Sequence, residues 1–419
     1  MSKQKSSKVP GFYKLSVKQR VEKLAEVAGV SAKEFEALLD LKTADLMAEN
    51  VVSTFALPLG VAMNFVINGI EFIVPMATEE SSVIAACSNG AKIARIHGGF
   101  TTECTDPLMI GQIQLLDVAD VKKAESALMQ NKEKLLSLAN QQDNVLVGFG
   151  GGARDIEVRV LDSPVGKMMV VHLVVDVRDA MGANVVNTMC EALAPVISEL
   201  CGGRARLKIL SNLCDKRLVK SKAIFDAEKM GGDEVVDAFL ESYVLASIDP
   251  YRAATHNKGI MNGIDAVVLA TGNDTRAVEA GAHAYAARKG QYSSLTRYWK
   301  DEQGNLVGEL QMPLALGMVG GAGSIHPSAL LAKKILGVST SQQLAEVVAS
   351  VGLAQNFAAV FALSTVGIQK GHMSLHAKNI AVMAGAIGDE IETLATRLVE
   401  DELVKIDYAK KVLEQMRKK

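Results

Sequence analysis

The feature that most restricts the fold is a strand-and-helix pattern that fills the chain between residues 108 and 216. Four segments alternate in the manner of strands and two have helical patterns, in the order strand 110–118, helix 120–140, strands 153–162 and 168–177, helix 179–203 and strand 204–210. A β-α-β-β-α-β order is that of a compact ferredoxin-like module. We therefore expect an α+β fold in which this small module interrupts a larger domain.

The sequence on both sides of the module has different patterns, with two hairpin signals and several longer helical segments. A β-rich stretch at 50–78 contains a hairpin signal at Asn68-Gly69, and a second hairpin at 295–313 turns near Gly304. Residues 266–272 have the pattern of a further strand. We expect two short helices within 16–40, an Ala-rich helix after Glu80, and helices at about 222–246, 274–289 and 327–365 and near the C-terminus.

Composition excludes several classes of function. The 419 residues carry a net charge of −2, with 49% apolar and 22% charged residues, a globular profile without a nucleic-acid or anionic-membrane signature. Five cysteines, an odd number with no Cys-x-x-Cys pair, favour a reducing cytoplasm. The N-terminus has no apolar signal region, and no stretch reaches the roughly 18 uncharged apolar residues of a membrane span. We expect a cytoplasmic protein that binds neither nucleic acid nor membrane.

Two glycine-rich segments are candidates for binding a dinucleotide. In 148–155 a strand follows the glycines, whereas a Rossmann loop opens a helix, so an ordinary Rossmann fold is not expected. In 174–184 a buried strand leads into Asp179, and Gly182 and Asn184 open a helix whose N–H groups suit a phosphate. The competing interpretation makes Asp179 an ordinary helix N-cap.

Residues 249–274 hold a dense group of polar side chains, namely Arg252, His256, Asn257, Lys258 and Asn262. Lys258 would neutralise a developing oxyanion, and Asp274, if close, would keep Lys258 charged and oriented. The competing interpretation is a surface Lys–Asp pair that contributes under about 1 kcal/mol.

Two further patterns suggest acid–base chemistry. Glu79 and Glu80 precede the Ala-rich helix, either as first-turn acids favoured by the helix dipole or with one of them as a working acid. His372 and His376 are four residues apart, which is half of a helical metal site, but no third ligand is evident and no metal is expected. A histidine beside Gly371 suits proton delivery, because the ordinary pKa of histidine lies near neutrality.

Five segments together resemble the hydroxymethylglutaryl-CoA (HMG-CoA) reductase family in its soluble class II form, and they occur in the family's order. They are ENVVSTFALPLGVAMNF (49–65), PMATEESSVIAACSN (75–89), DAMGANVVNTMCE (179–191), 249–274 and GIQKGHMSLHAKN (367–379). The resemblance covers nearly the whole chain. It implies a two-hydride reduction of 3-hydroxy-3-methylglutaryl-CoA to mevalonate and free CoA, or the reverse oxidative acylation.

The resemblance also implies a division of the chain. Residues 1–107 and 217–368 would form a large mixed α/β domain that binds the CoA thioester. Residues 108–216 would form the ferredoxin-like cofactor domain, and 369–419 a C-terminal helical flap. Members of the family are homodimers with the active site at the subunit interface, and a trimer of dimers is compatible with this.

Site residues follow from the matching motifs. Glu80 corresponds to the catalytic acid, Lys258 to the catalytic lysine, Asp274 to the aspartate between them, and His372 to the histidine that protonates the CoA thiolate. A buried, protonated Glu80 would supply the proton of the aldehyde step, which leaves Glu79 as the helix-dipole acid. Substrate contacts are expected at Ser82, Arg252, Asn262, Gln355 and Asn356. Cofactor contacts are expected at Asp143, Asp179, Met181, Gly182, Asn184 and Asn187.

Asp143 bears on the choice of cofactor, because NADH-using relatives carry an acid there for the ribose 2′-hydroxyl. A carboxylate repels a 2′-phosphate, so we expect NADH to be preferred over NADPH. Two other functions stay open. One is a CoA-thioester enzyme without redox chemistry, which would need a nucleophilic Cys or Ser. The other is a non-catalytic sensor or assembly module that kept the fold.

Overall fold

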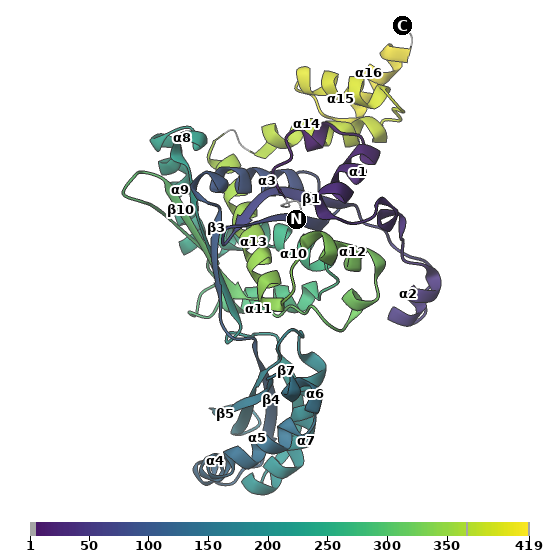
Figure 1. Ribbon diagram of the computed structural model, residues 1–419. Coiled ribbons are helices and arrows are strands. Elements are labelled where there is room, and N and C mark those ends of the chain that lie inside the picture. The colour runs from purple at the N-terminus through teal and green to yellow at the C-terminus, as the bar shows by residue number, and fades with distance from the viewer. Residues whose placement is uncertain (1–5, 366–367, 418–419) are drawn as a thin grey trace.

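The computed structural model describes residues 6–365 and 368–417, apart from the side chains of residues 322 and 368–375, and two β-sheets organise this part of the chain (Figure 1). The larger sheet has the strand order β2-β1-β3-β8-β10-β9, and the smaller one the order β5-β6-β4-β7. The strands of the larger sheet are β1 Leu59–Ile67, β2 Ile70–Ala77, β3 Phe100–Cys104, β8 Leu218–Phe225, β9 Thr296–Lys300 and β10 Leu306–Pro313. Those of the smaller sheet are β4 Leu108–Leu116, β5 Gly152–Leu161, β6 Met168–Asp176 and β7 Arg204–Ser211.

The smaller sheet is antiparallel and lies at one end of the molecule (Figure 1). Its helices are α4 Val121–Gln130, α5 Lys132–Asn140, α6 Asn144–Gly148 and α7 Ala183–Cys201. Val186 and Leu193 of α7 pack on Met109 and Ile113 of β4 and on Leu173 of β6 in one apolar core. The elements follow one another in the predicted β-α-β-β-α-β order, with the first and third strands at the centre of the sheet.

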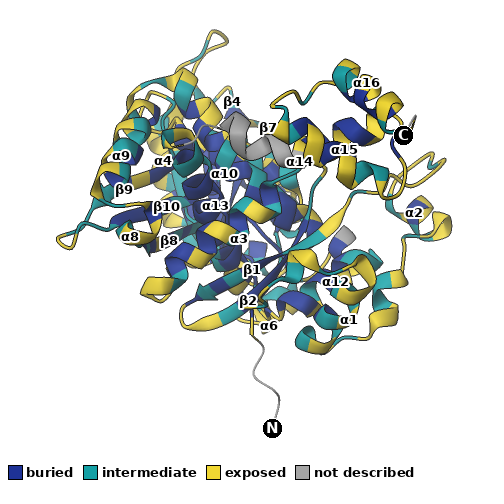
Figure 2. Ribbon diagram, turned by 90° about the horizontal axis from the view of Figure 1, so that it is seen from above, coloured by how far each residue is buried: buried dark blue, intermediate teal, exposed yellow. Residues whose placement is uncertain are grey.

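Helix α13 (Ser341–Ser364) is the centre of the larger core, and Figure 2 shows it buried along most of its length. It packs against α3 (Val83–Ala94), α10 (Pro250–Ala270) and β8. The Phe357 ring stacks on Phe225 with ring centroids 3.7 Å apart. By length and composition α13 alone among the described helices could cross a membrane, which the sequence analysis overlooked. However, 72% of its most apolar window is buried inside the protein, as in a core helix.

The remaining helices surround these layers. Beside the larger sheet lie α8 Ala227–Met230, α9 Asp233–Ile248, α11 Thr275–Ala286 and α12 Pro327–Leu336. The N-terminal part contributes α1 Val17–Ala28 and α2 Leu41–Met47, and short 3₁₀ turns lie at Phe12–Lys14, Ala32–Glu36, Arg95–His97 and Ala322–Ser324. The C-terminal helices, α14 Ile368–Met383, α15 Glu390–Glu400 and α16 Ile406–Arg417, share an apolar core of their own, at the end of the molecule away from the smaller sheet (Figure 1).

Local sequence signals located most elements correctly. The errors are a helix end predicted as a strand and a strand predicted as part of a helix. Both hairpins form as predicted, β1 with β2 through Asn68-Gly69 and β9 with β10 through Gly304, whose φ is 83°. The strand predicted at 266–272 is instead the end of α10. Each valine lowers helix stability by only a fraction of a kcal/mol relative to alanine. Val267 and Val268 are both fully buried in α10, so the free energy of packing outweighs their preference for strands.

The helix predicted from residue 222 is also wrong in its first part. Residues 218–225 form β8, which pairs with β3 and β10, and the helix α9 begins at Asp233. Burial alternates along β8, with Val219, Ser221, Ala223 and Phe225 inside and two lysines on the other face. The alternation is weak in the sequence because two of the four buried residues are the small Ser221 and Ala223.

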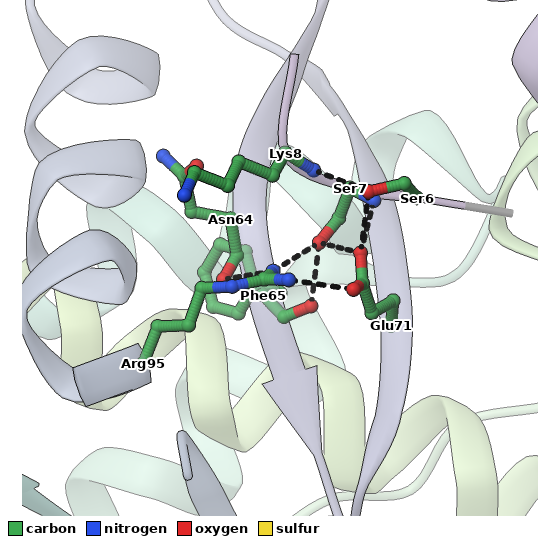
Figure 3. A network of polar contacts seen from close by, with 7 residues as sticks. All are labelled: Ser6, Ser7, Lys8, Asn64, Phe65, Glu71 and Arg95. Carbon is green, nitrogen blue, oxygen red and sulfur yellow. Dashed lines mark hydrogen bonds and ion pairs between the residues drawn. The ribbon is translucent and has the colours of Figure 1, made fainter. Parts of the chain in front are cut away.

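The N-terminal segment is fixed to the larger sheet by a polar network around Glu71 (Figure 3). The Glu71 carboxylate accepts hydrogen bonds from the Ser7 backbone N–H and from the Arg95 guanidinium, each at 2.5 Å. Arg95 also donates to the Ser7 hydroxyl at 2.9 Å. Burial alone would raise the pKa of Glu71, but the hydrogen bonds from Arg95 and Ser7 outweigh it and lower the pKa to about 2.

We expect Glu71→Gln to lower the free energy of unfolding by roughly 2 kcal/mol near neutral pH, because a charge-assisted hydrogen-bond network is lost. The folded pKa of Glu71 lies below its ordinary 4.5, so this stabilisation is present above about pH 4.5 and is lost as the pH falls towards 2. Denaturant unfolding of both proteins measures the difference. It should shrink between about pH 5 and 3, whereas Glu103→Gln, at an exposed acid, should change little. A pH-independent difference would contradict this account.

Candidate active site

Helix α10 carries a row of polar side chains on the face turned away from the core. Asp249 caps the helix by accepting a hydrogen bond from the Arg252 N–H at 2.8 Å, and Pro250 occupies the first turn. Lys258 and Asn262 follow one turn apart on one face, Lys258 exposed and Asn262 half-buried. The helix therefore presents these side chains as a rigid row.

Glu80 meets this row from the turn between β2 and α3. Its carboxylate lies 3.1 Å from the Lys258 ammonium. Ser82, which ends the turn, has a φ of 78°, a left-handed conformation that is uncommon outside glycine and often marks functional turns. The predicted burial of Glu80 is not found within one chain, where 42% of its side chain and 61% of that of Lys258 are exposed. The pair is open to a substrate from solvent.

Asp274 is not the partner of Lys258 within one chain. It caps α11, where its carboxylate accepts hydrogen bonds from the Arg276 and Ala277 N–H groups at 3.0 and 3.2 Å. The Arg276 guanidinium donates two more hydrogen bonds at 3.0 Å and lowers the pKa of Asp274. The prediction that Asp274 orients Lys258 therefore does not hold for contacts inside the chain, because Glu80 takes that place.

Gln355 and Asn356 are neighbours on α13 with different surroundings. Asn356 is 1% exposed, and its amide oxygen accepts hydrogen bonds from the Thr296 and Tyr298 hydroxyls at 3.1 and 2.8 Å. These bonds give Asn356 a structural role in the core, and its substrate contact stays a prediction. Gln355 is also buried, but its side-chain oxygen has no hydrogen-bond partner among the described residues. An orphaned buried oxygen beside α10 is what a substrate hydroxyl could satisfy.

Histidine and cysteine residues complete the candidates. His372 belongs to α14, but its side chain lies outside the described residues, so its role stays a prediction; His376 is exposed. Among the side chains that the structure describes, no three His, Cys, Asp or Glu residues are grouped to hold a metal. Burial raises the pKa of Cys190 to about 12 and that of Cys214 to about 11, as in core thiols rather than nucleophiles.

The turn that leads into α7 is tied to the start of α13 and to the loop after β10 through Asp179. The Asp179 carboxylate accepts the backbone N–H of Ser341, at the start of α13, at 2.7 Å, and its carbonyl accepts the Met318 N–H at 2.8 Å. Asp179 is therefore not the N-cap of α7. That position is taken by Gly182, with a φ of 103°, where a Cβ would lie 2.6 Å from the Val177 side chain. Glycine is required there by both conformation and space.

Arg217 fixes the same turn, and the sequence analysis did not identify it. Its guanidinium is buried and donates to the carbonyls of Ala180 and Leu316 at 3.1 and 2.6 Å and to the Ser341 hydroxyl at 3.2 Å. Burial lowers the pKa of Arg217 to about 10. These bonds join the turn, the loop after β10 and α13. An isolated arginine before a strand gives no sequence signal of such a role.

The N-terminus of α7 fits an anionic ligand. Gly182 supplies no side-chain cap to this 19-residue helix, Asn184 is exposed and Met181 is half-buried. First-turn N–H groups without a side-chain acceptor, together with the positive end of the helix dipole, suit the diphosphate of a dinucleotide. Asn187 has another task, since its side-chain oxygen accepts the Leu210 N–H at 2.9 Å and ties α7 to β7.

Asp143 lies in a segment that is hydrogen-bonded to this turn. It caps α6, where its carboxylate accepts the Leu146 N–H at 2.9 Å. The loop after α6 is joined to the turn before α7 by Arg178, which donates to the Gly150 carbonyl at 2.6 Å and pairs with the buried Asp176 at 2.7 Å. The Asp143 segment and the start of α7 thus form one connected unit, as a dinucleotide that contacts both would need.

Comparisons with known proteins agree with this geometry. The family model described as hydroxymethylglutaryl-coenzyme A reductase matches residues 16–377. The chain is 54% identical over 416 residues to 3-hydroxy-3-methylglutaryl-coenzyme A reductase of Archaeoglobus fulgidus, covering 98% of this chain and 95% of that protein. It is 35% identical over 385 residues to a probable reductase of the same name from Borreliella burgdorferi, covering 88% and 86%.

Solved structures show the same relationship. A 3-hydroxy-3-methylglutaryl-coenzyme A reductase from Streptococcus pneumoniae matches with a TM-score of 0.84 and 41% identity, over 97% of this chain and 99% of that one. A structure of the class II enzyme from that species, bound to NADPH in open conformations, matches with a TM-score of 0.82 and 41% identity, over 96% and 100%.

The fold and the site thus define an oxidoreductase that acts on a CoA thioester. The chain belongs to the class II hydroxymethylglutaryl-CoA reductase family, whose activity is the reduction of HMG-CoA in the mevalonate pathway. The resemblance seen in five sequence segments is confirmed, and so is the α+β fold class.

Proposed function

We propose that this chain reduces HMG-CoA to mevalonate and free CoA by two successive hydride transfers, and that Glu80 and Lys258 act on the acyl oxygen. The observation that carries the proposal is their 3.1 Å contact on an accessible face of α10. The bound nicotinamide cofactor supplies the hydride. Beside it, an ammonium group stabilises the negative charge that develops on the oxygen as the carbonyl is reduced.

The proton steps are assigned to separate residues. Reduction of the thioester gives a hemithioacetal oxyanion, which Lys258 stabilises. Its collapse breaks the C–S bond and leaves an aldehyde and the CoA thiolate, which His372 protonates. Reduction of the aldehyde then gives an alkoxide that takes its proton from Glu80. Glu80 must be protonated at that point, which requires it to be covered from water. Asp274 stays a predicted catalytic residue without a contact that assigns its step.

Substrate and cofactor contacts are proposed on the same geometric grounds. Arg252 and Asn262 lie on α10 before and after Lys258, and Ser82 follows Glu80 by two residues. The orphaned oxygen of Gln355 supports a contact with the acyl group. Met181, Gly182 and Asn184 would bind the diphosphate, with Asp143 on the ribose. Asp179 and Asn187 would position the turn and α7 without a direct contact.

The partner that would cover the active site is a second copy of this chain. Val52 and Phe55, in the segment before β1, are 92% and 91% exposed, and Tyr251, on the helix that carries Lys258, is 87% exposed. Large apolar side chains so exposed, one of them on the helix that carries Lys258, support a homodimer whose interface includes the site. We further propose a cytoplasmic enzyme, with domains at 1–107 plus 217–368 and at 108–216, and with the C-terminal helices as a flap over the thioester.

The proposed reaction has a fixed stoichiometry. With NADH and HMG-CoA in excess, absorbance at 340 nm and a thiol reagent should report two NADH oxidised for each CoA released, because the aldehyde is reduced before it leaves. One NADH per CoA would contradict the second reduction. CoA release without NADH oxidation would favour a thioester enzyme of another class. The same assay run from mevalonate, CoA and NAD⁺ gives the rate of the oxidative direction.

We propose a preference for NADH over NADPH and expect Asp143→Asn to weaken it. The amide can still cap α6 but no longer repels a 2′-phosphate, so the ratio of kcat/KM for NADPH to that for NADH should rise about tenfold or more. Asp162→Asn, at an acid in the loop after β5, serves as the control. Equal kcat/KM values for both cofactors in the wild type would contradict the preference. An unchanged ratio in the variant would contradict the role of Asp143.

A further inference from the structure

A glycine-rich loop, residues 317–323, lies between β10 and α12, and the chemistry described above gives it no task. It runs against the turn before α7, where we propose that the cofactor binds. The Met318 N–H donates to the Asp179 carbonyl at 2.8 Å, and Val319 pairs with Ala180 in an isolated parallel bridge. The loop is therefore in direct backbone contact with that turn.

The first residue of the loop is held from the end of α10. Asn273, in the turn after α10, accepts the Gly317 N–H with its side-chain oxygen at 2.7 Å and donates to the Thr271 hydroxyl at 3.1 Å. A Cβ on Gly317 would lie 2.8 Å from the Met181 backbone nitrogen, so this close approach requires glycine. The loop thus connects the end of α10 to the turn before α7.

Lys333 holds the same loop from α12, a helix that packs against α10 (Figure 1). Its ammonium donates to the Met318 carbonyl at 3.2 Å and to the Gly323 carbonyl at 3.1 Å. Lys333 is half-buried, and no carboxylate in the described part of the chain pairs with it. Burial without such a partner lowers the pKa of Lys333. The burial of this charge costs free energy that the two hydrogen bonds must offset.

The next lysine along α12 has none of these contacts. Lys334 is exposed and forms an ion pair with Glu34, in the 3₁₀ turn Ala32–Glu36. Both lysines lie in the last turn of α12, so the dipole of the helix acts on both. The chain therefore offers a matched pair of charges, one bonded to the loop and one away from it.

The middle of the loop is open to solvent. Val319 is 59% exposed, and Gly320 and Gly321 are exposed with left-handed φ values of 76° and 63°. Among the described residues, no atom beyond the chain neighbours lies within 4 Å of a Cβ built on either glycine. Because this part has few contacts of its own, the hydrogen bonds at the two ends determine where the loop lies.

We infer that Lys333 and Asn273 are positioning residues, which hold the loop 317–323 against residues 179–181 and thereby set the affinity for the nicotinamide cofactor. Neither side chain needs to touch the cofactor. Gly182 follows this segment directly, so a displaced loop would move the first N–H groups of α7 away from the diphosphate. The inference rests on the proposed function for the identity of the ligand that binds at this turn.

The test measures the binding of each ligand separately, so it needs no turnover. In calorimetric titrations of the whole chain, Lys333→Met should raise the Kd of NADH about tenfold, because methionine donates no hydrogen bond to either carbonyl. The Kd of HMG-CoA should change by less than about threefold, since the Glu80–Lys258 pair makes no hydrogen bond to the loop. Lys334→Met is the matched control and should keep both Kd values within about twofold of the wild type.

Two results would overturn the positioning role, namely an unchanged Kd for NADH in Lys333→Met and equal losses of affinity for NADH and HMG-CoA. If circular dichroism shows that Lys333→Met does not fold, Asn273→Ala releases the same loop at Gly317 and takes its place, with the same difference expected between the two ligands. Absence of turnover in a wild type that binds NADH would contradict the proposed reaction, and the Kd values would still decide the role of the loop.

Discussion

The contact between Lys258 and Glu80 is the interaction on which the rest of this site depends. It joins two elements that are far apart in sequence, the turn after β2 and the middle of α10, at 3.1 Å. The helix is fixed by its Asp249 cap and by a face packed on α13, and the turn ends in the left-handed Ser82. An ammonium and a carboxyl held by rigid elements can act on one acyl oxygen with little reorganisation.

The turn before α7, where we propose that the cofactor binds, is held mostly by hydrogen bonds to backbone groups. Arg217 and Asp179 hold the turn before α7 through carbonyl and N–H groups of α13 and of the loop after β10. Gly182 brings the backbone close to Val177, where a side chain would not fit. The two halves of the site thus meet at α13, whose N-terminus anchors the turn and whose middle carries Gln355 beside α10. Movement of the smaller sheet relative to α13 would change both halves together.

Much of this arrangement could be predicted from sequence, because the signals are local. The Asn68-Gly69 hairpin, the capping box of Ser16 and Gln19, and the glycine that opens α7 each follow from the conformational preferences of one or two residues. The order of elements in the smaller sheet follows from periodicity. The candidate residues Glu80 and Lys258 were identified by motif, and their proximity is what the fold adds.

The remainder depends on contacts that no local pattern encodes. The valines of α10 read as a strand because burial against α13 is invisible in the sequence. Asp274 was predicted to contact Lys258 on chemical grounds. Within the chain its carboxylate instead accepts hydrogen bonds from Arg276 and from the first turn of α11. Arg217 gave no signal, since its role arises only when distant segments meet.

The most direct test of the account is a double-mutant cycle on the turnover number, with Lys258→Met, Glu80→Gln and the double variant. If both side chains act on one acyl oxygen, each single change should cost about a hundredfold or more in kcat, and the double variant should be no slower than the worse single one. Costs that simply add, or a single variant that turns over HMG-CoA at the wild-type rate, would show that the two groups do not work as a unit.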